Sequence, residues 1–136
     1  MNNNLPMTHS EGFLKLVNAA KARVQQTDVA GASAKMKANP NALLIDVRED
    51  DEFRKEHVSG AMHIGKGVIE RDIETLVPDK DRELLLYCGG GFRSALAADA
   101  LRQMGYKNVW SVDGGFRAYK AAGAPMVIGK EMEGGL

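Results

Sequence analysis

Apolar residues near the start of the chain recur at steps of three and four positions. They are Phe13, Leu14, Val17, Ala20 and Val24. This spacing places them on one face of a helix, and Ser10 stands ahead of them as a suitable N-cap. We therefore predict an amphipathic helix over residues 10–25. Its apolar face should pack on the rest of the protein, because an exposed apolar face would promote aggregation.

Further along the chain, short apolar runs predict strands. The runs cover residues 42–47 (ALLIDV), 61–64 (AMHI), 84–87 (LLLY) and 109–112 (VWSV), and a further short strand is possible near 24–28. The runs in ALLIDV and LLLY are continuous, which is typical of parallel strands that are covered on both faces. Helical stretches separate the runs, at 29–37, 50–55, 68–76, 94–104 and 116–122. This alternation of strands and helices predicts an α/β fold.

The helix predicted over 94–104 begins just after the run LLLY. One face carries Leu96, Ala97, Ala100, Leu101 and Met104, and another carries Asp99, Arg102 and Gln103. Cys88 stands at the carboxyl end of the buried strand, and its loop leads directly into the N-terminus of this helix. Ligands bind at this position in open α/β sheets.

Composition narrows the class of protein. The chain has 136 residues, enough for one domain, and its 18 basic and 18 acidic residues give a formal net charge of zero. A neutral chain argues against nucleic acid or an anionic membrane surface as its main partner. The sequence contains neither a membrane-spanning run nor a signal-peptide pattern. A single cysteine excludes an internal disulfide and predicts a reducing compartment, the cytoplasm.

The stretch CGGGFRS, residues 88–94, combines the only thiol of the chain with three consecutive glycines. If the loop curls around the sulfur, its backbone N–H groups form a nest that stabilises an anion. The helix that follows adds the positive end of its dipole, and Arg93 adds a charge. These features lower the pKa of a cysteine. We predict that Cys88 is a thiolate nucleophile and that the same nest holds a persulfide.

Four stretches, taken in order, resemble the rhodanese (sulfurtransferase) family over residues 27–126. Cys88, Gly91, Arg93 and Ser94 stand where that family has Cys-x-x-Gly-x-Arg-Ser. The other three stretches are LLIDVREDDEF (43–53), HVSGAMHI (57–64) and DGGFRAYKAAGAP (113–125). Glu56 departs from the family pattern, where glycine is frequent, and Tyr119 replaces the usual tryptophan.

The resemblance implies a five-stranded parallel sheet flanked by helices on both faces. It divides the chain into an N-terminal extension (1–26), a rhodanese-like domain (27–126) and a loose tail (127–136). It also implies a ping-pong transfer of sulfur, without a cofactor or metal, from thiosulfate or a similar anion to cyanide or a thiol. Any acceptor protein stays unidentified.

The chemistry of the loop and the resemblance together suggest roles for individual residues. Cys88 is expected to be the catalytic residue, and the expected anion-binding residues are Gly89, Gly90, Gly91, Phe92, Arg93 and Ser94. Ser94 is either part of the site or only a helix cap. Asp46 and Arg48 are expected to be structural residues near the site. Lys66 and Arg71 are candidates for the mouth of the site, although solvent exposure is the simpler reading for both. His57 and His63 lack the spacing of zinc ligands.

Two other functions stay open. A phosphatase of the rhodanese-like type places five residues between its cysteine and arginine, whereas only four separate Cys88 from Arg93. A non-catalytic rhodanese-like module that acts as a sulfur carrier or in protein interaction is the other alternative; an inactive interaction module typically lacks the cysteine, so Cys88 argues against it. A thioredoxin-like function would need a second cysteine nearby.

Overall fold

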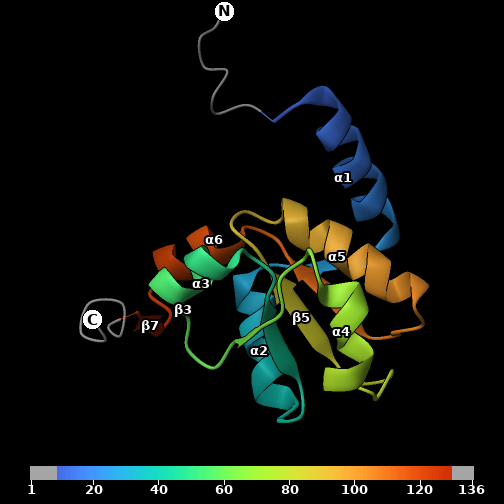
Figure 1. The fold of residues 1–136 in the computed structure, drawn as a ribbon. Helices are drawn as coiled ribbons and strands as arrows, with labels where there is room; N and C mark the ends of the chain where they lie inside the picture. Colours follow the sequence, from blue (N-terminus) through green and yellow to red (C-terminus); the bar gives the residue numbers. More distant parts are fainter. Residues whose placement is uncertain (1–8, 130–136) are drawn as a thin grey trace, which may run out of the picture.

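The computed structural model describes residues 9–129 and contains the predicted parallel sheet (Figure 1). The strand order is β1-β6-β5-β2-β4, and every neighbouring pair is parallel. The strands are β1 (Gln25–Thr27), β2 (Leu43–Asp46), β4 (Met62–His63), β5 (Leu84–Tyr87) and β6 (Val109–Val112). Four of them correspond to the apolar runs in the sequence, and β1 lies within the short strand that was considered possible near 24–28. The α/β class and the five-stranded sheet are therefore confirmed.

Within residues 9–129, six helices precede or connect the strands, and each lies within one or two residues of its predicted bounds. They are α1 (Glu11–Arg23), α2 (Val29–Ala38), α3 (Asp50–Lys55), α4 (Ile69–Leu76), α5 (Phe92–Gln103) and α6 (Gly115–Ala121). Ser10 is the N-cap of α1, since its hydroxyl accepts a hydrogen bond from the Phe13 N–H at 3.4 Å. At α2 the Asp28 carboxylate does the same for the Gly31 N–H at 2.8 Å.

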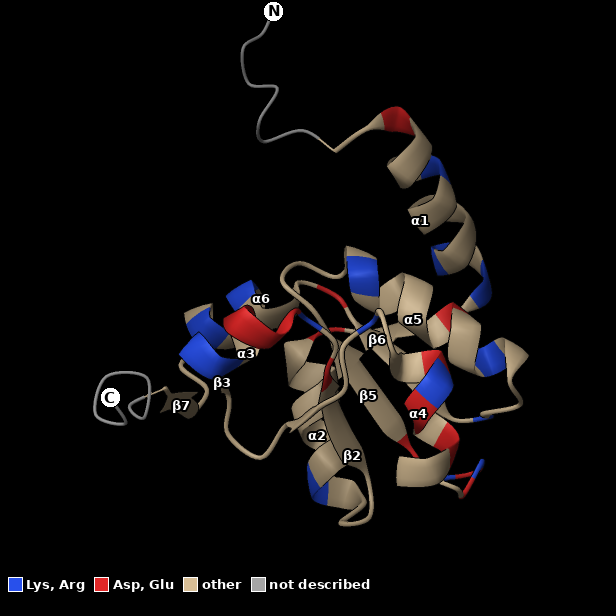
Figure 2. Cartoon of the chain, in the orientation of Figure 1, with Lys and Arg blue, Asp and Glu red and all other residues tan. Residues whose placement is uncertain are grey.

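The continuous run in β5 is explained by two cores, one on each face of the sheet. Leu84 and Leu86 join one core together with residues of α4 and α5. Leu85 and Tyr87 join the other, together with residues of α2 and α6. Successive side chains of a strand point to opposite faces, so both sets must be apolar. Figure 2 shows the charged residues on the helices and loops that surround this uncharged strand.

A second, two-stranded sheet has no counterpart in the sequence analysis. It pairs β3 (Glu56–Val58) with β7 (Met126–Ile128) in antiparallel fashion. Residues 127 and 128, assigned to a loose tail, therefore belong to a strand, and residues 130–136 lie outside the described range. Glu56 has φ −168°. Any residue adopts this extended conformation, so the departure from glycine carries no backbone strain.

Helix α1 lies along α5 on the outer side of the molecule (Figure 1). Val17 and Ala20 are fully buried in this contact. The Arg23 guanidinium makes two hydrogen bonds to the Asp99 carboxylate, at 3.1 and 2.8 Å. The sequence placed Asp99 on a polar face of its helix together with Arg102 and Gln103, but Asp99 is only 6% exposed because that face contacts α1. The polar face predicted for α5 is in part an interface.

Candidate active site at the carboxyl end of β5

Cys88 follows the central strand β5, and α5 begins four residues later at Phe92. The thiol is free and almost fully buried, with 1% of the residue exposed. Gly91, the N-cap of α5, has φ +106°, a left-handed conformation that favours glycine. This turn lets the Gly91 N–H point back and donate a hydrogen bond to the Cys88 sulfur at 3.1 Å. The glycine-rich loop thus directs a backbone donor at the sulfur.

Two buried serines extend the contacts of the sulfur. The neutral thiol donates to the Ser94 hydroxyl at 3.5 Å. The Ser94 oxygen lies 2.8 Å from the Ser111 hydroxyl of β6, and either group can be the donor. When Ser111 donates, the Ser94 proton is free to turn toward the sulfur, an arrangement that favours the thiolate. Ser94 lies inside α5 rather than at its cap, and Ser111 was not singled out from the sequence.

These contacts decide the acidity of the thiol. Burial raises the pKa of Cys88, because a charge forms less readily away from water. Hydrogen bonds from the Ser94 hydroxyl and from the backbone N–H groups of Ser94, Gly91 and Gly90 act in the opposite direction. The net pKa of Cys88 lies below the ordinary value of a cysteine. The site therefore has the electrostatics of an activated nucleophile.

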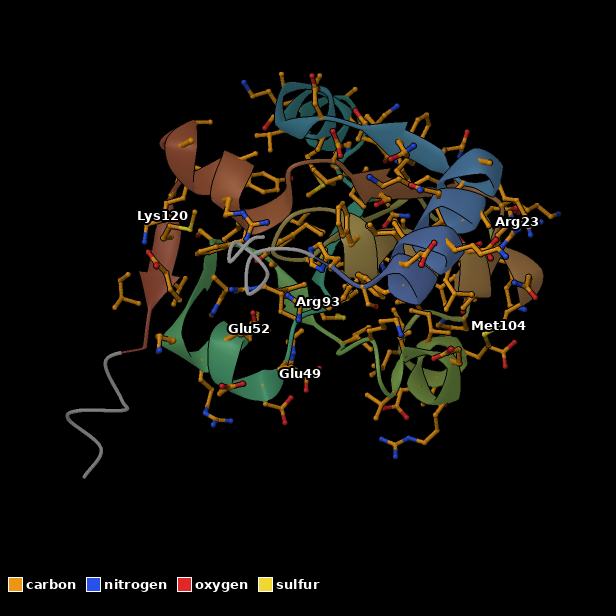
Figure 3. The ribbon with its side chains drawn as sticks, turned by 90° about the horizontal axis from the view of Figure 1, so that it is seen from above. Arg23, Glu49, Glu52, Arg93, Met104 and Lys120 are labelled. Carbon is orange, nitrogen blue, oxygen red and sulfur yellow. The ribbon has the colours of Figure 1, made fainter. Side chains whose placement is uncertain are left out.

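Arg93, predicted as an anion-binding residue, already has an anionic partner. Its guanidinium donates to the Glu52 carboxylate of α3 at 2.9 and 3.3 Å. Figure 3 shows the two side chains close together, from different elements. The hydrogen bond from Arg93 lowers the pKa of Glu52. Glu52 also accepts from the Glu49 N–H at 3.0 Å, in the capping box of α3. Arg93 is thus held in place beside the loop.

The start of α6 supports the back of the loop. The Phe116 N–H donates to the Cys88 carbonyl at 2.6 Å, and the Arg117 N–H donates to the Gly89 carbonyl at 3.2 Å. A Cβ atom at Gly115 would overlap the Cys88 carbonyl oxygen, so only glycine allows this approach. The stretch DGGFR therefore positions the loop, a role that the sequence analysis did not assign.

Asp46 and Arg48 form a buried ion pair at the end of the neighbouring strand β2. The Arg48 Nη2 lies 2.9 Å from Asp46 Oδ2, and Asp46 Oδ1 also accepts from the Arg48 N–H at 2.9 Å. Arg48 donates in addition to the Glu56 carbonyl at 2.6 Å. Its guanidinium carbon lies 4.2 Å from the centre of the Phe116 ring. The pair thus connects β2, β3 and the start of α6.

A cavity of about 700 Å³ opens over Cys88. Five of its lining residues come from the predicted loop: Cys88, Gly89, Gly90, Phe92 and Arg93. The others are Arg117 of α6 and, from the N-terminal region, His9 and Phe13. The sequence analysis missed these three in the site. Among the residues that the structure describes, Lys66 and Arg71 are not part of this lining; Arg71 pairs with Asp72 on α4.

Within residues 9–129, no group of three or more His, Cys, Asp and Glu residues is arranged to hold a metal ion. None of the helices in that range combines the length and apolarity needed to cross a membrane.

Comparison with known proteins gives consistent results. A family model, the rhodanese-like domain, matches residues 29–122. The Bacillus subtilis protein named "Putative sulfurtransferase YtwF" is 35% identical over 102 residues, which are 75% of this chain and 96% of that protein. Thiosulfate sulfurtransferase GlpE of Coxiella burnetii is 34% identical over 79 residues, 58% of this chain and 72% of that protein.

Among solved structures, RPA3614 of Rhodopseudomonas palustris, described as a "Possible Tyrosine Phosphatase", is 28% identical with a TM-score of 0.77. The match covers 93% of this chain and 99% of that one. The fold, the order of the four sequence motifs and these matches agree: the chain belongs to the rhodanese-like domain family.

Proposed function

We propose that this protein is a rhodanese-type sulfurtransferase that carries sulfur on Cys88, from thiosulfate or a similar donor to cyanide or a thiol. One observation carries the proposal: the only thiol of the chain lies in a loop whose N–H groups lower its pKa despite burial. The sulfurtransferase names of the relatives support it.

The reaction consists of two displacements. The Cys88 thiolate attacks the outer sulfur of thiosulfate, the sulfur–sulfur bond of the donor breaks, and sulfite leaves with the electron pair. The enzyme then carries a persulfide, whose outer sulfur an acceptor attacks, and the thiolate is restored. Donors aimed at the sulfur stabilise the thiolate at the start and the end of this cycle. No residue is needed as a general base, because the resting nucleophile is already favoured as an anion.

The loop can also stabilise the outer sulfur of the persulfide. Gly89 and Gly90 line the cavity beside Cys88 with bare backbone, so a second sulfur atom can approach their N–H groups closely. The Arg93–Glu52 pair keeps a guanidinium near this position without leaving an unbalanced charge. The one thiol must stay reduced for this chemistry, and we therefore infer a cytoplasmic location.

The test is a stoichiometric loading experiment. The protein is incubated with thiosulfate, its intact mass is recorded, and cyanide is then added. We expect a gain of one sulfur atom that cyanide removes, with release of thiocyanate. The Cys88→Ser variant should gain no mass.

A phosphatase is the second candidate, because RPA3614 carries that description. Hydrolysis of an aryl phosphate by the wild type but not by Cys88→Ser, without any loading of sulfur, would overturn the proposal in favour of it.

A further inference from the structure

The cavity over Cys88 is larger than an inorganic donor or cyanide requires. Its volume of about 700 Å³ falls in the range of roughly 300–1,000 Å³ typical of sites for organic ligands. His9 and Phe13 contribute to it from outside residues 29–122, which the family model matches. The N-terminal segment thus adds a wall to the site that the family's own motifs do not supply.

That wall is aromatic. The Phe92 ring lies 4.7 Å from the His9 ring and 6.2 Å from the Phe13 ring, and His9 and Phe13 are 5.3 Å apart, measured between ring centres. Lys21 lies 4.8 Å from the centre of the Phe92 ring. Such a surface binds the carbon body of a ligand rather than a small hydrated anion.

Helix α1 holds this wall firmly against the rest of the protein. Val17 and Ala20 have no exposed surface, and Asp99 of α5 binds the Arg23 guanidinium at the far end of the helix. In Figure 3, Arg23 lies far along α1 from the position of Arg93. Because these contacts hold α1 against α5, the first turn of α1, which contains Phe13, is kept beside the cavity.

A cationic side chain, Arg117, also lines the cavity. Arg93 is neutralised by Glu52. Among the ion pairs in the described part of the chain, none involves Arg117. The Arg117 guanidinium lies against Gly90, where a Cβ atom would overlap it. The bare glycines therefore let a guanidinium without an ion-pair partner lie against the loop that follows Cys88.

We propose that the aromatic wall (His9, Phe13 and Phe92) and Arg117 form the acceptor subsite, and that it takes a low-molecular-weight organic thiol with a carboxylate and an apolar body. This inference rests on the proposed function. Arg117 binds the carboxylate, the wall binds the carbon body, and the thiol of the acceptor reaches Cys88 between them.

The transfer needs no further reactant. The acceptor thiolate attacks the outer sulfur of the Cys88 persulfide and forms a new sulfur–sulfur bond. The bond between that sulfur and Cys88 breaks, and its electron pair stays on the Cys88 sulfur as a thiolate. The proton of the protonated persulfide leaves with the transferred sulfur. The products are the acceptor persulfide and the resting enzyme.

The experiment isolates this half of the reaction. Cys88 is loaded with polysulfide, excess donor is removed, and loading is verified by intact mass. The persulfide is then discharged in a single turnover with cysteamine, thiolactate or β-phenylthiolactate. Cysteamine is cationic, thiolactate carries a carboxylate, and the third thiol adds a phenyl ring to thiolactate. The variants are Arg117→Gln and Phe13→Ala. Their matched controls are Arg71→Gln on α4 and Leu16→Ala, whose side chain is exposed on α1.

For the wild type, we expect β-phenylthiolactate to discharge the persulfide faster than thiolactate. Arg117→Gln should slow both carboxylate thiols about fivefold, the loss of one ion pair at a partly exposed site, and should not slow cysteamine. Phe13→Ala should reduce the preference for the phenyl ring about fivefold. Both controls should match the wild type.

Equal slowing of all three thiols by either variant, or no preference of the wild type for the phenyl ring, would overturn the acceptor subsite. These outcomes leave the proposed function intact. Failure of both thiosulfate and polysulfide to load Cys88 would instead overturn the proposed function, and the subsite with it.

Discussion

The sulfur cradle and the lining of the cavity over Cys88 are built by different means. The cradle comprises the Cys88 sulfur, the backbone N–H groups of Gly90, Gly91 and Ser94, and the hydroxyls of Ser94 and Ser111; Cys88, Gly91, Ser94 and Ser111 are buried. The wall consists of the rings of His9, Phe13 and Phe92, and Arg117 lines the cavity with it. These four side chains are half-buried or exposed, and they come from the N-terminal region, α5 and α6.

The contrast separates two tasks. Backbone donors in the glycine loop favour negative charge on the sulfur and make no other distinction between substrates, so the cradle suits any sulfur transfer. Side chains that face the cavity select substrates by their shape and charge. These side chains can be substituted without disturbing the loop. We therefore expect substitutions in the cradle to affect the chemistry and those in the wall to affect the choice of substrate.

The largest effect is expected at the centre of the cradle. Cys88→Ala should abolish sulfur transfer because no other thiol exists in the chain. The melting temperature should change little, since the loop is held by the start of α6 and by its own turn. Thiosulfate:cyanide turnover and thermal unfolding measure the two effects. Residual turnover in a folded variant would show that the cradle is not the site of chemistry.

Gly91→Ala should have the next largest effect, on both stability and reactivity. A left-handed non-glycine residue costs roughly 1–2 kcal/mol, and the added Cβ would lie 3.3 Å from Asp113 Oδ1 and from the Gly114 nitrogen. The turn should shift, so the N–H donor moves away from the sulfur and the pKa of Cys88 rises. Turnover near neutral pH should fall at least tenfold. Gly12→Ala, in open space on α1, is the matched control. Wild-type turnover in Gly91→Ala would mean that the left-handed turn at Gly91 is not needed to direct an N–H donor at the Cys88 sulfur.

Sequence analysis could predict the cradle but not the wall, because the two differ in how far their parts are separated along the chain. Cys88, the glycines and Ser94 are neighbours, and local rules for strand ends, glycine turns and helix starts are enough to place them. His9, Phe13 and Arg117 reach the cavity only through the packing of α1 on α5 and of α6 behind the loop. The sequence showed the apolar spacing that includes Phe13 and the motif that includes Arg117. No local pattern indicated that these side chains line the cavity over Cys88.

The same limit explains the other differences. The sequence analysis assigned Arg93 to anion binding, and a cation at the start of a helix does call for an anionic partner because it opposes the helix dipole. It could not show that Glu52, 41 positions earlier, supplies a carboxylate. The pairing of β3 with β7 joins two three-residue segments about 70 positions apart, and strands this short carry almost no periodicity.

A third prediction tests the two serines of the cradle against each other. Ser94→Ala removes a hydroxyl that favours the charged sulfur, so the pKa of Cys88 should rise and the thiolate fraction at neutral pH should fall. Ser111→Ala leaves that hydroxyl in place and should raise the pKa less. The measurement is the ultraviolet absorbance of the thiolate across pH, with Cys88→Ser as the blank. Equal pKa shifts in both variants would contradict the arrangement in which Ser94 contacts the sulfur directly and Ser111 acts only through Ser94.

The smallest effect is expected in the support of the wall. Val17→Ala removes two buried methyl groups between α1 and α5 and should lower the free energy of unfolding by about 1–2 kcal/mol. The sulfur cradle is independent of this contact, so the pKa of Cys88 and the loading by thiosulfate should match the wild type. A looser α1 should instead weaken the preference for a phenyl-bearing thiol. Denaturant unfolding and single-turnover discharge measure the two effects, with exposed Leu16→Ala as the control. If Val17→Ala shifted the pKa of Cys88, the cradle and the wall would be one coupled unit rather than two.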